Sequence, residues 1–418
     1  MADWHVTPTQ IYKPSGDVVS SGWPIQDVLG ADHWSSSGRN RERMCSPGDT
    51  IRLVDGIHRH FRVTHSRHVE NRPITVVGED QNTTFIGPNP VGGSHTLYLE
   101  KCHKHQFQDI TFLGDDTAAV MTERPQRGRD EGVPEWDSLS VSDTHFRRCD
   151  VDGGFNWSDG SGPRNKWLLQ SYELGKTEYP GAVGFSWDHG SFSGCYHEHA
   201  MYLHNIQGHI SFTNLTVNGM GRSWAQTTNR VGDGPMGKGT LYFGDCYAWD
   251  LGLNDGSSAL SFRSGHRGAI VLNRVTIKQG DASDIDPRWA ENVTGCLVTH
   301  KGSDSHENAY PDLFMTQCRF HMGRHRQGLG SFRRENTHLS FLRRCKLRGN
   351  FIKSWPGARE ALVIQPQTIE HLDIDESNRV IGDVVIQTDA DRAVFKDPDQ
   401  SGAAFGEALT YLRQLGVS

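Results

Sequence analysis

A short pattern of apolar and polar positions recurs along this chain of 418 residues. It reads apolar, two polar, apolar, one polar, apolar, and its copies begin at Phe107, Phe146, Phe212, Phe243, Leu272, Met315 and Leu342. Each copy predicts a strand, a one-residue corner and a second strand. Neither strand can bury its apolar side chains alone, so the copies must stack on one another as the units of a solenoid do.

The spacing of the copies indicates the kind of solenoid. Phe212 and Phe243 lie 31 residues apart, and Phe243 and Leu272 lie 29 residues apart. The copies are rich in β-branched and aromatic residues, and helical periodicity is missing until the last residues. We therefore predict an all-β, three-sided parallel β-helix with loop insertions. The wide gap between Phe146 and Phe212 implies an extra coil or a long loop.

The two ends of the chain differ from the repeats. Residues 1–45 hold three tryptophans, several prolines and a polar run, and we predict an N-terminal cap or attachment arm there. Residues 46–400 form the predicted β-helix. Helical spacing of Phe405, Leu409 and Leu412 predicts a short C-terminal helix that caps the last coil over residues 401–418.

Eight cysteines occur in the chain, and four of them share one position of the repeat. These are Cys149, Cys246, Cys318 and Cys345. A shared register predicts a column of buried free thiols rather than disulfides, because a thiol packs as a small apolar group. No Cys-x-x-Cys pair occurs, so we expect no cysteine zinc site.

The charge balance excludes some classes of partner. Asp and Glu outnumber Lys and Arg by 50 to 43, the net charge is −7, and no long basic run occurs, so nucleic-acid binding is not expected. No run of 18 apolar residues is present, so we expect no membrane insertion. The first residues lack the basic and apolar regions of a secretory leader, which predicts assembly in the cytoplasm unless a leader has been removed.

The opening repeats resemble a known superfamily. The run Pro47-Gly-Asp-Thr-Ile51, the Asp55-Gly56 turn and the step Ile74-Thr-Val-Val-Gly78 are similar to the first coils of right-handed β-helix proteins of the pectate-lyase-like superfamily. The resemblance extends over residues 46 to about 350. It implies a right-handed coil, and it leaves the activity open because many functions share this fold.

The densest group of chemically versatile side chains lies between Trp187 and Arg222. Strand alternation over residues 197–204 would place His197 and His199 on one face, and Glu198, Tyr202 and His204 on the other. The segment resembles a coil common in carbohydrate-active β-helix proteins at Glu198, His199, Tyr202, Asn205 and Arg222, with Ala200 and Met201 in place of the usual Gly and Ile.

That resemblance implies a polysaccharide groove. In a lyase, His199 would act as base, Tyr202 as acid and Arg222 as the group that neutralises a uronate carboxylate. A hydrolase would need two facing carboxylates, for which the candidates are Asp188, Glu198, Asp233 and Asp255. Two alternatives stay open: a ladder of stacked His, Asn and Tyr side chains with a structural role, and a metal bound by the His197-Glu-His199 pair.

Further side chains could contact a sugar or an ion. We predict substrate contacts by Trp157, Trp167, His197, His204, Trp224 and Asp233, since aromatic rings can stack on sugar rings. Asp281, Asp284 and Asp286 could hold calcium, but they lack the spacing of an EF-hand, so a solvated acidic loop is the preferred explanation and no metal ligand is assigned.

Two hypotheses of function follow. In the first, the chain is a virion surface protein, tailspike-like or decorating, that binds host or environmental glycans with or without cleaving them. It would then form a homotrimer or contact other virion proteins, and the apparent lack of a leader and the free thiols favour this role. In the second, it is a polysaccharide lyase or glycoside hydrolase that acts on an acidic polysaccharide, which the His, Tyr and Arg cluster favours.

Overall fold

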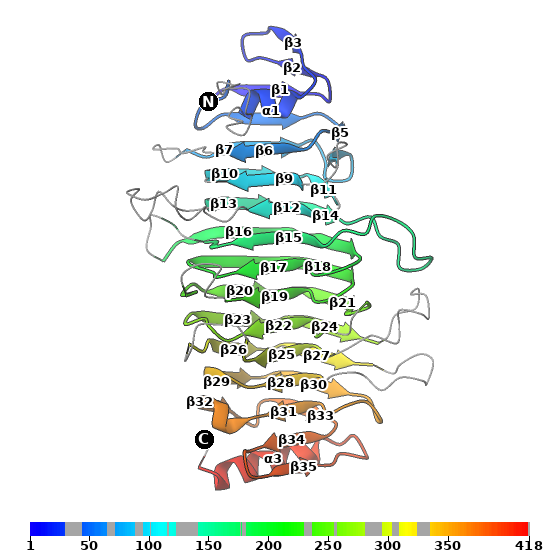
Figure 1. Cartoon of the computed structure of the whole chain (residues 1–418), viewed down its shortest axis with the longest axis vertical. Coiled ribbons are helices and arrows are strands. Elements are labelled where there is room, and N and C mark those ends of the chain that lie inside the picture. Colours follow the sequence, from blue (N-terminus) through cyan, green and yellow to red (C-terminus); the bar gives the residue numbers. More distant parts are fainter. Residues whose placement is uncertain are drawn as a thin grey trace.

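The chain folds as a right-handed parallel β-helix, as predicted. The structure is a computed structural model that describes residues 1–29, 44–64, 72–87, 95–100, 102–114, 117–122, 141–175, 177, 181–229, 236–254, 257–280, 295–302, 309–323 and 335–416. Figure 1 shows the coils stacked along the long axis of the molecule, with the two ends of the chain at opposite ends of the stack.

Each coil contributes strands to three walls. The first wall consists of β4 (Thr50–Leu53), β7 (Ile74–Gly78), β10 (Cys102–Gln108), β13 (Val141–Arg147), the first halves of β16 (Val183–Cys195) and β18 (His209–Met220), β20 (Leu241–Gly244), β23 (Ala269–Asn273), β26 (Asp312–Thr316), β29 (Leu342–Arg348) and β32 (Ile369–Ile374). The second wall consists of β5 (Gly56–His58), β8 (Thr84–Ile86), β11 (Thr111–Leu113), β14 (Asp150–Asp152), the second halves of β16 and β18, β21 (Tyr247–Leu251), β24 (Thr276–Gln279), β27 (Arg319–Met322), β30 (Phe351–Ser354) and β33 (Arg379–Ile381).

The third wall is a separate 12-stranded sheet. Its parallel strands are β6 (Phe61–Thr64), β9 (His95–Glu100), β12 (Ala118–Thr122), β15 (Trp167–Tyr172), β17 (Met201–His204), β19 (Ala225–Thr228), β22 (Leu260–Arg263), β25 (Leu297–His300), β28 (Thr337–Leu339), β31 (Leu362–Ile364) and β34 (Val384–Gln387). Only its last strand, β35 (Arg392–Phe395), runs antiparallel to its neighbour.

The repeat places large apolar side chains above one another inside the first wall. Consecutive coils pair Phe107 with Phe146, Phe146 with Trp187, and Trp187 with Phe212. The rings of Phe107 and Phe146 lie 4.8 Å apart, and those of Phe146 and Trp187 lie 4.1 Å apart in parallel planes. Burial of each such ring stabilises the coil by about 2–3 kcal/mol, so this column holds the stack together.

One residue turns the chain from the first wall into the second. This corner residue has a positive φ near 50° in coil after coil, at Asp109, Arg148, His189, Asn214, Asp245, Arg274 and Gln317. Neighbouring corners pair across coils: Arg148 binds Asp109, and Arg274 binds Asp245, each through two hydrogen bonds of 2.5–2.6 Å. These charge pairs on the surface offset part of the left-handed strain, which costs roughly 1 kcal/mol per residue.

The wide gap after Phe146 contains an extra coil. Trp187-Asp-His-Gly190-Ser-Phe192 is a further copy of the repeat, since Trp187 pairs with Phe146 and Phe212, and Phe192 pairs with Val151. Gly190 takes the inner corner position that an apolar residue occupies elsewhere. This coil also follows a long insertion over residues 153–166.

The prediction that Leu342 begins a copy of the repeat was wrong. Leu347, not Leu342, pairs with Met315, so the true copy is Leu347-Arg-Gly-Asn350-Phe-Ile352. Cys345 therefore lies within the first wall, opposite Leu313, and not at the corner with Cys318. All eight cysteines are nevertheless buried and free, as predicted.

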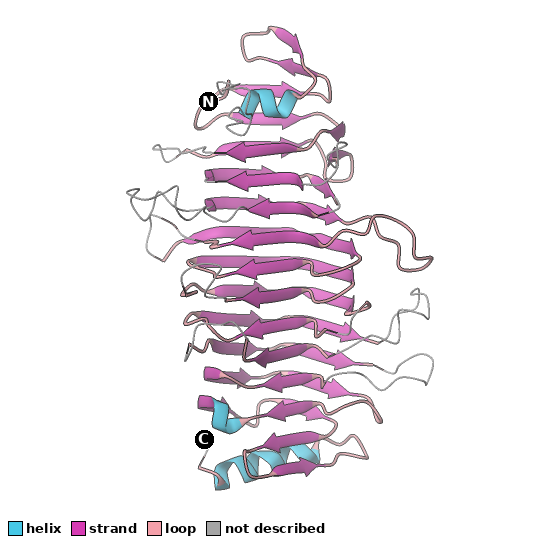
Figure 2. Ribbon diagram, viewed as in Figure 1, coloured by secondary structure: helices cyan, strands magenta, loops and turns pink. Residues whose placement is uncertain are grey.

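Both ends of the stack carry extra elements, which Figure 2 distinguishes by colour. At the N-terminus, β1 (Asp3–Val6) pairs parallel with β4, while β2 (Gln10–Tyr12) and β3 (Val18–Ser20) continue it antiparallel, and α1 is formed by Pro24–Leu29. At the C-terminus, the short 3₁₀ helix Pro366–Thr368 precedes β32, and α3 (Ala403–Gln414) packs on β33, β34 and β35. The predicted domain boundaries stay predictions. Among the described residues, no helix is long and apolar enough to span a bilayer.

Candidate functional site

An insertion between β14 and β15 forms the frame of the candidate site. Residues 153–166 project from the corner between the second and third walls, in green at the right of Figure 1. The insertion folds back on the stack through Trp157, whose indole N–H donates to the carbonyl of Gly219 at 2.7 Å. Buried Asn165 closes its other end, donating to the Gly153 carbonyl at 2.8 Å and accepting the backbone N–H of Tyr196 at 3.1 Å.

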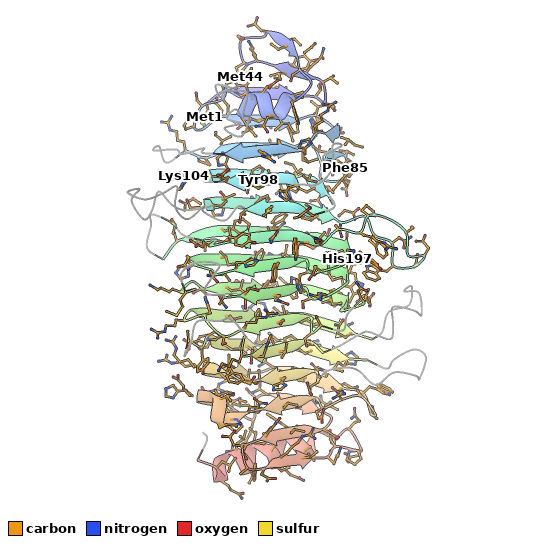
Figure 3. All side chains as sticks on the ribbon, viewed as in Figure 1. Met1, Met44, Phe85, Tyr98, Lys104 and His197 are labelled. Carbon is orange, nitrogen blue, oxygen red and sulfur yellow. The ribbon has the colours of Figure 1, made fainter. Side chains whose placement is uncertain are left out.

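The frame places cations beside an exposed histidine. His197 lies on the corner of the next coil, on the side from which the insertion projects (Figure 3). Partial burial and the positive charges of Arg164, Lys166 and Arg222 lower the pKa of His197, so its ring is neutral at neutral pH. A neutral imidazole at this position can accept a proton, and it does not compete with Arg164 and Lys166 for an anion.

Aromatic rings accompany these cations. The guanidinium of Arg164 lies 5.0 Å from the centre of the Tyr196 ring, and the ammonium of Lys166 lies 5.9 Å from that of Trp167. Trp167 in turn stacks on Tyr202, with ring centres 5.9 Å apart in nearly parallel planes. Cation–π contacts orient a cation without neutralising it, so both side chains stay available for a carboxylate.

Glu198 and His199 are held in place by their neighbours. Arg222 donates to Oε2 of Glu198 at 2.9 Å, and Nε2 of His199 lies 3.4 Å from the same oxygen. Nδ1 of His199 accepts the backbone N–H of Ser223 at 3.2 Å, which puts the proton of the neutral ring on Nε2. Complete burial lowers the pKa of His199 well below its usual value. The predicted role of His199 as the base therefore fails, since the ring is only 1% exposed and both nitrogens are engaged.

The alternation predicted for residues 197–204 holds only in part. β17 begins at Met201, and residues 196–200 lie outside any strand, so Glu198 and His199 do not sit on opposite faces of a strand. Tyr202 is half-buried and points to the outer face, as predicted. His204 is only 5% exposed because its ring stacks on Tyr172 at 4.1 Å, so it acts as part of an aromatic layer.

Three other predicted site residues have structural roles. Asp188 sits at the corner between the first and second walls, where it accepts hydrogen bonds from Thr213 at 2.6 Å and Asn214 at 2.9 Å. Burial raises the pKa of Asp188, but these hydrogen bonds and that of His189 outweigh burial and keep the pKa below its usual value. Trp224 is fully buried against Phe243, which rules out sugar stacking, and Trp157 is a buried anchor of the insertion.

No group of side chains suited to a metal ion is found within the described part of the chain. His197 and His199 belong to this part of the chain, so the alternative of a metal held by these two imidazoles receives no support. Asp233, Asp255 and the proposed calcium ligands Asp281, Asp284 and Asp286 lie outside the described residues.

The sequence did not reveal Arg164, Lys166 and Tyr196 as members of the site. The first two belong to the insertion and are 33 and 31 residues from His197 in the sequence. Their signal was weak: two cations around Asn165, directly before a tryptophan that begins a strand. Only the fold of the insertion brings them to the histidine.

Comparisons with known proteins concern the fold. Pectate lyase Pel9A is similar to this chain with a TM-score of 0.48, 10% identity, and coverage of 90% of this chain and 79% of that chain. An alginate lyase from Paenibacillus sp. str. FPU-7 has a TM-score of 0.40 and 10% identity, and the match covers 79% of this chain and 94% of that chain. Pectin methylesterase from carrot has a TM-score of 0.34 and 12% identity, and the match covers 83% of this chain and 88% of that chain. No family model and no curated protein sequence matches the chain. The parallel β-helix predicted from the sequence is confirmed by the strand pairing of the chain itself.

Proposed function

We propose that the corner site binds an acidic polysaccharide and cleaves it by elimination. The observation that carries this proposal is the exposed, neutral His197 among three cations: Arg164, Lys166 and Arg222. A uronate chain supplies a carboxylate for the cations and, next to it, the carbon-bound proton that a base must remove. The rings of Tyr196, Trp167 and Tyr202 line the same corner and offer apolar surface to sugar rings.

The chemistry follows from this placement. Arg164 and Lys166 neutralise the carboxylate, which stabilises the carbanion that forms when the neighbouring C–H bond breaks. His197 takes that proton, and the released electron pair forms a carbon–carbon double bond as the glycosidic oxygen departs and takes a proton from water. Glu198 keeps Arg222 in place through their ion pair.

Hydrolysis by two carboxylates is the weaker alternative. Asp188 and Glu198 lie at opposite ends of the second wall in their coil, at the corners that begin and end it. They cannot face one glycosidic bond together, which inverting and retaining hydrolases both require. The virion role and the homotrimer stay predictions, and they become the favoured explanation if the site binds glycans without cleaving them.

Cleavage assays on polyuronates test the proposal. Polygalacturonate, alginate and a neutral glucan are incubated with the protein, and unsaturated ends are followed by their ultraviolet absorbance. We expect cleavage of at least one polyuronate, and His197→Gln should lower kcat by about 10²–10⁴-fold. His189→Gln, at another exposed histidine on the opposite corner, should leave kcat unchanged.

The outcomes separate the hypotheses. Binding of polyuronates that is weakened by Arg164→Ala but never leads to cleavage would support a glycan-binding protein in place of an enzyme. Equal activity of His197→Gln and the natural protein would exclude His197 as the base. If no polyuronate is bound or cleaved, the proposed substrate class is wrong.

A further inference from the structure

A second set of cations lies on the outer face of the second wall, in coils nearer the C-terminus than the corner site. Strand pairing aligns outward side chains of β21, β24, β27, β30 and β33 in two parallel columns. One column contains Tyr247, Thr276, Arg319, Phe351 and Arg379, and the other contains Trp249, Lys278, His321 and Lys353. From β24 onward, each coil therefore presents at least one basic side chain.

Aromatic rings hold several of these cations. The ammonium of Lys278 lies 5.7 Å from the ring centre of Tyr247, and the guanidinium of Arg379 lies 5.6 Å from that of Phe351. Lys353 lies at 5.7 Å from the exposed ring of Trp355. The rings restrict the motion of the long basic side chains, and the charges stay unneutralised.

The contrast with the rest of the surface is informative. Arginines of the first wall and its corner bind carboxylates, as in the pairs Arg148 with Asp109, Arg274 with Asp245, and Arg343 with Asp312. Among the described residues, no carboxylate forms an ion pair with the cations of the second wall, which are Lys278, Arg319, Lys353 and Arg379. A protein with a net charge of −7 thus has one row of cations that no carboxylate of the described residues neutralises.

The columns border a groove. A cavity of about 480 Å³ is lined by Tyr247, Thr276, Lys278, Arg319, His321, Phe351 and Lys353. Neighbouring strands of a sheet lie about 4.8 Å apart, so the groove runs along the stack with a similar distance between successive coils. Its lining is a regular array rather than a closed pocket, which suits an extended polymer better than a small molecule.

We propose that this groove binds a linear acidic polysaccharide lying along the stack, with its carboxylates on the row of cations. The proposal shares its class of ligand with the proposed function but concerns a separate site. Duplex DNA presents a charge about every 1.7 Å along its axis, and a single strand about every 3.4 Å, both denser than one Lys or Arg per coil of about 4.8 Å. A uronate chain, with one carboxylate per sugar, matches the spacing of the cations better. The groove would retain the polymer while the corner site acts on it.

Binding measurements on two substituted proteins test this inference. Lys278→Gln combined with Lys353→Gln removes two groove cations, and Lys346→Gln combined with Lys396→Gln removes two lysines that are paired with Asp373 and Asp383 elsewhere. Titration with long-chain polygalacturonate should show at least a tenfold higher Kd for the groove protein and an unchanged Kd for the control. The slope of log Kd against log salt should fall by about 2 in magnitude for the groove protein alone.

Two further ligands make the result decisive. Fully methyl-esterified polygalacturonate, which lacks the charges, should bind the natural protein weakly. A single-stranded DNA of equal length should also bind more weakly than the polyuronate. An unchanged Kd in the groove protein, equal binding of the esterified polymer, or tighter binding of DNA would each overturn the proposal.

The experiments distinguish failure of the corner proposal from failure of the groove proposal. If only the corner proposal is wrong, cleavage is missing and the groove protein still loses affinity for the long polymer. If only the groove proposal is wrong, the groove protein binds long chains normally while Arg164→Ala still impairs cleavage. The thermal unfolding midpoint of each substituted protein shows that it is folded, as expected for half-buried or exposed side chains on one outer wall.

Discussion

At the scale of single residues, the histidines differ in function because their surroundings differ. His199 is fully buried with both ring nitrogens engaged, and His266 is buried so completely that its pKa falls to about 4. His197, only two residues from His199, is exposed to solvent and to the field of three cations. Among these three histidines, only His197 can exchange a proton with a bound ligand.

The lowered pKa of His197 predicts the pH dependence of cleavage. Burial and positive neighbours disfavour the protonated ring, so the neutral base predominates from a pH below 6.5 upward. We expect kcat/KM to be constant around neutral pH and to fall tenfold per pH unit on the acid side of the lowered pKa. Arg164→Gln should shift this acid limb to higher pH, since it removes a positive neighbour. A limb that does not move in Arg164→Gln would contradict the assignment.

Gly190 is required by the extra coil. A Cβ at this position would lie 1.9 Å from the carbonyl oxygen of Cys149, and its φ is +153°. We therefore expect Gly190→Ala to lower the free energy of unfolding by about 3 kcal/mol or more. Gly181→Ala is the control: its φ is +83°, but no heavy atom of the described residues lies within 4 Å of the added methyl, so the cost should be about 1 kcal/mol. Urea denaturation measures both, and equal losses would show that crowding at Gly190 has no effect.

At the scale of the coil, the inner corner position changes character toward the C-terminus. It is apolar in most coils, as at Cys149, Leu215 and Val275, and becomes asparagine in the last two, at Asn350 and Asn378. The buried amides form a ladder in which Nδ2 of Asn350 donates to Oδ1 of Asn378 at 2.9 Å. The asparagine side chains form hydrogen bonds with backbone groups that an apolar side chain could not bind.

The ladder makes Asn350 a strong test of coil stability. Its amide accepts the backbone N–H of Cys318 at 2.9 Å and donates to the carbonyl of Met315 at 3.0 Å. Asn350→Ala leaves both groups buried without this partner, and we expect a loss of about 2–4 kcal/mol in the free energy of unfolding. The loss in a double substitution with Asn378→Ala should be smaller than the sum of the single losses. Strict additivity would show that the two amides act independently.

The repeat could be predicted from the sequence because burial in the core requires the same kinds of residue at the same positions of each coil. An apolar side chain at each inward position and a short corner recur wherever the core is continuous, so most copies were visible. The exceptions are the positions where another residue meets the same constraint: Gly190 takes the corner under Trp187, and Asn350 takes it by hydrogen bonding. A pattern that requires an apolar corner misses the copy that begins at Trp187. It also misplaces the copy that begins at Leu347, and this error assigned Cys345 to the wrong column.

The site could be predicted only in part, for a related reason. Glu198, Tyr202 and Arg222 belong to the regular coils, so their proximity follows from the repeat. Arg164 and Lys166 come from an insertion whose path depends on Trp157 docking to the Gly219 carbonyl. Sequence spacing also cannot show burial, and burial alone separates His197 from His199 and removes Trp224 from the surface.

At the scale of the whole molecule, buried histidines make the stack sensitive to acid. Burial lowers the pKa of His58, His145 and His199, and it brings those of His95 and His266 to about 4. Below pH 6.5 these histidines bind protons in the unfolded chain but not in the folded chain, so protonation favours unfolding. Stability is complete above pH 6.5 and declines as the pH falls toward 4, by about 3 kcal/mol each for His95 and His266.

Thermal unfolding followed by circular dichroism checks this expectation. The midpoint should be constant between pH 7 and 8 and fall steeply between pH 6.5 and 4.5. Added salt should restore little of the loss, because the cause is burial rather than repulsion between exposed charges. A midpoint that is unchanged down to pH 4.5 would mean that these rings are hydrated or charged in the folded protein.

The single left-handed residue between the first and second walls has an architectural consequence. A turn that short cannot accept an insertion without breaking the alignment of both walls, whereas the long insertion of residues 153–166 is accommodated where the second wall passes into the third. The first and second walls therefore keep one strand per coil in a regular array, and insertions are confined to the other two corners of the coil. The length of ligand that these walls can bind is then set by the number of coils. Gain or loss of one whole coil would lengthen or shorten the binding surface by the width of one strand.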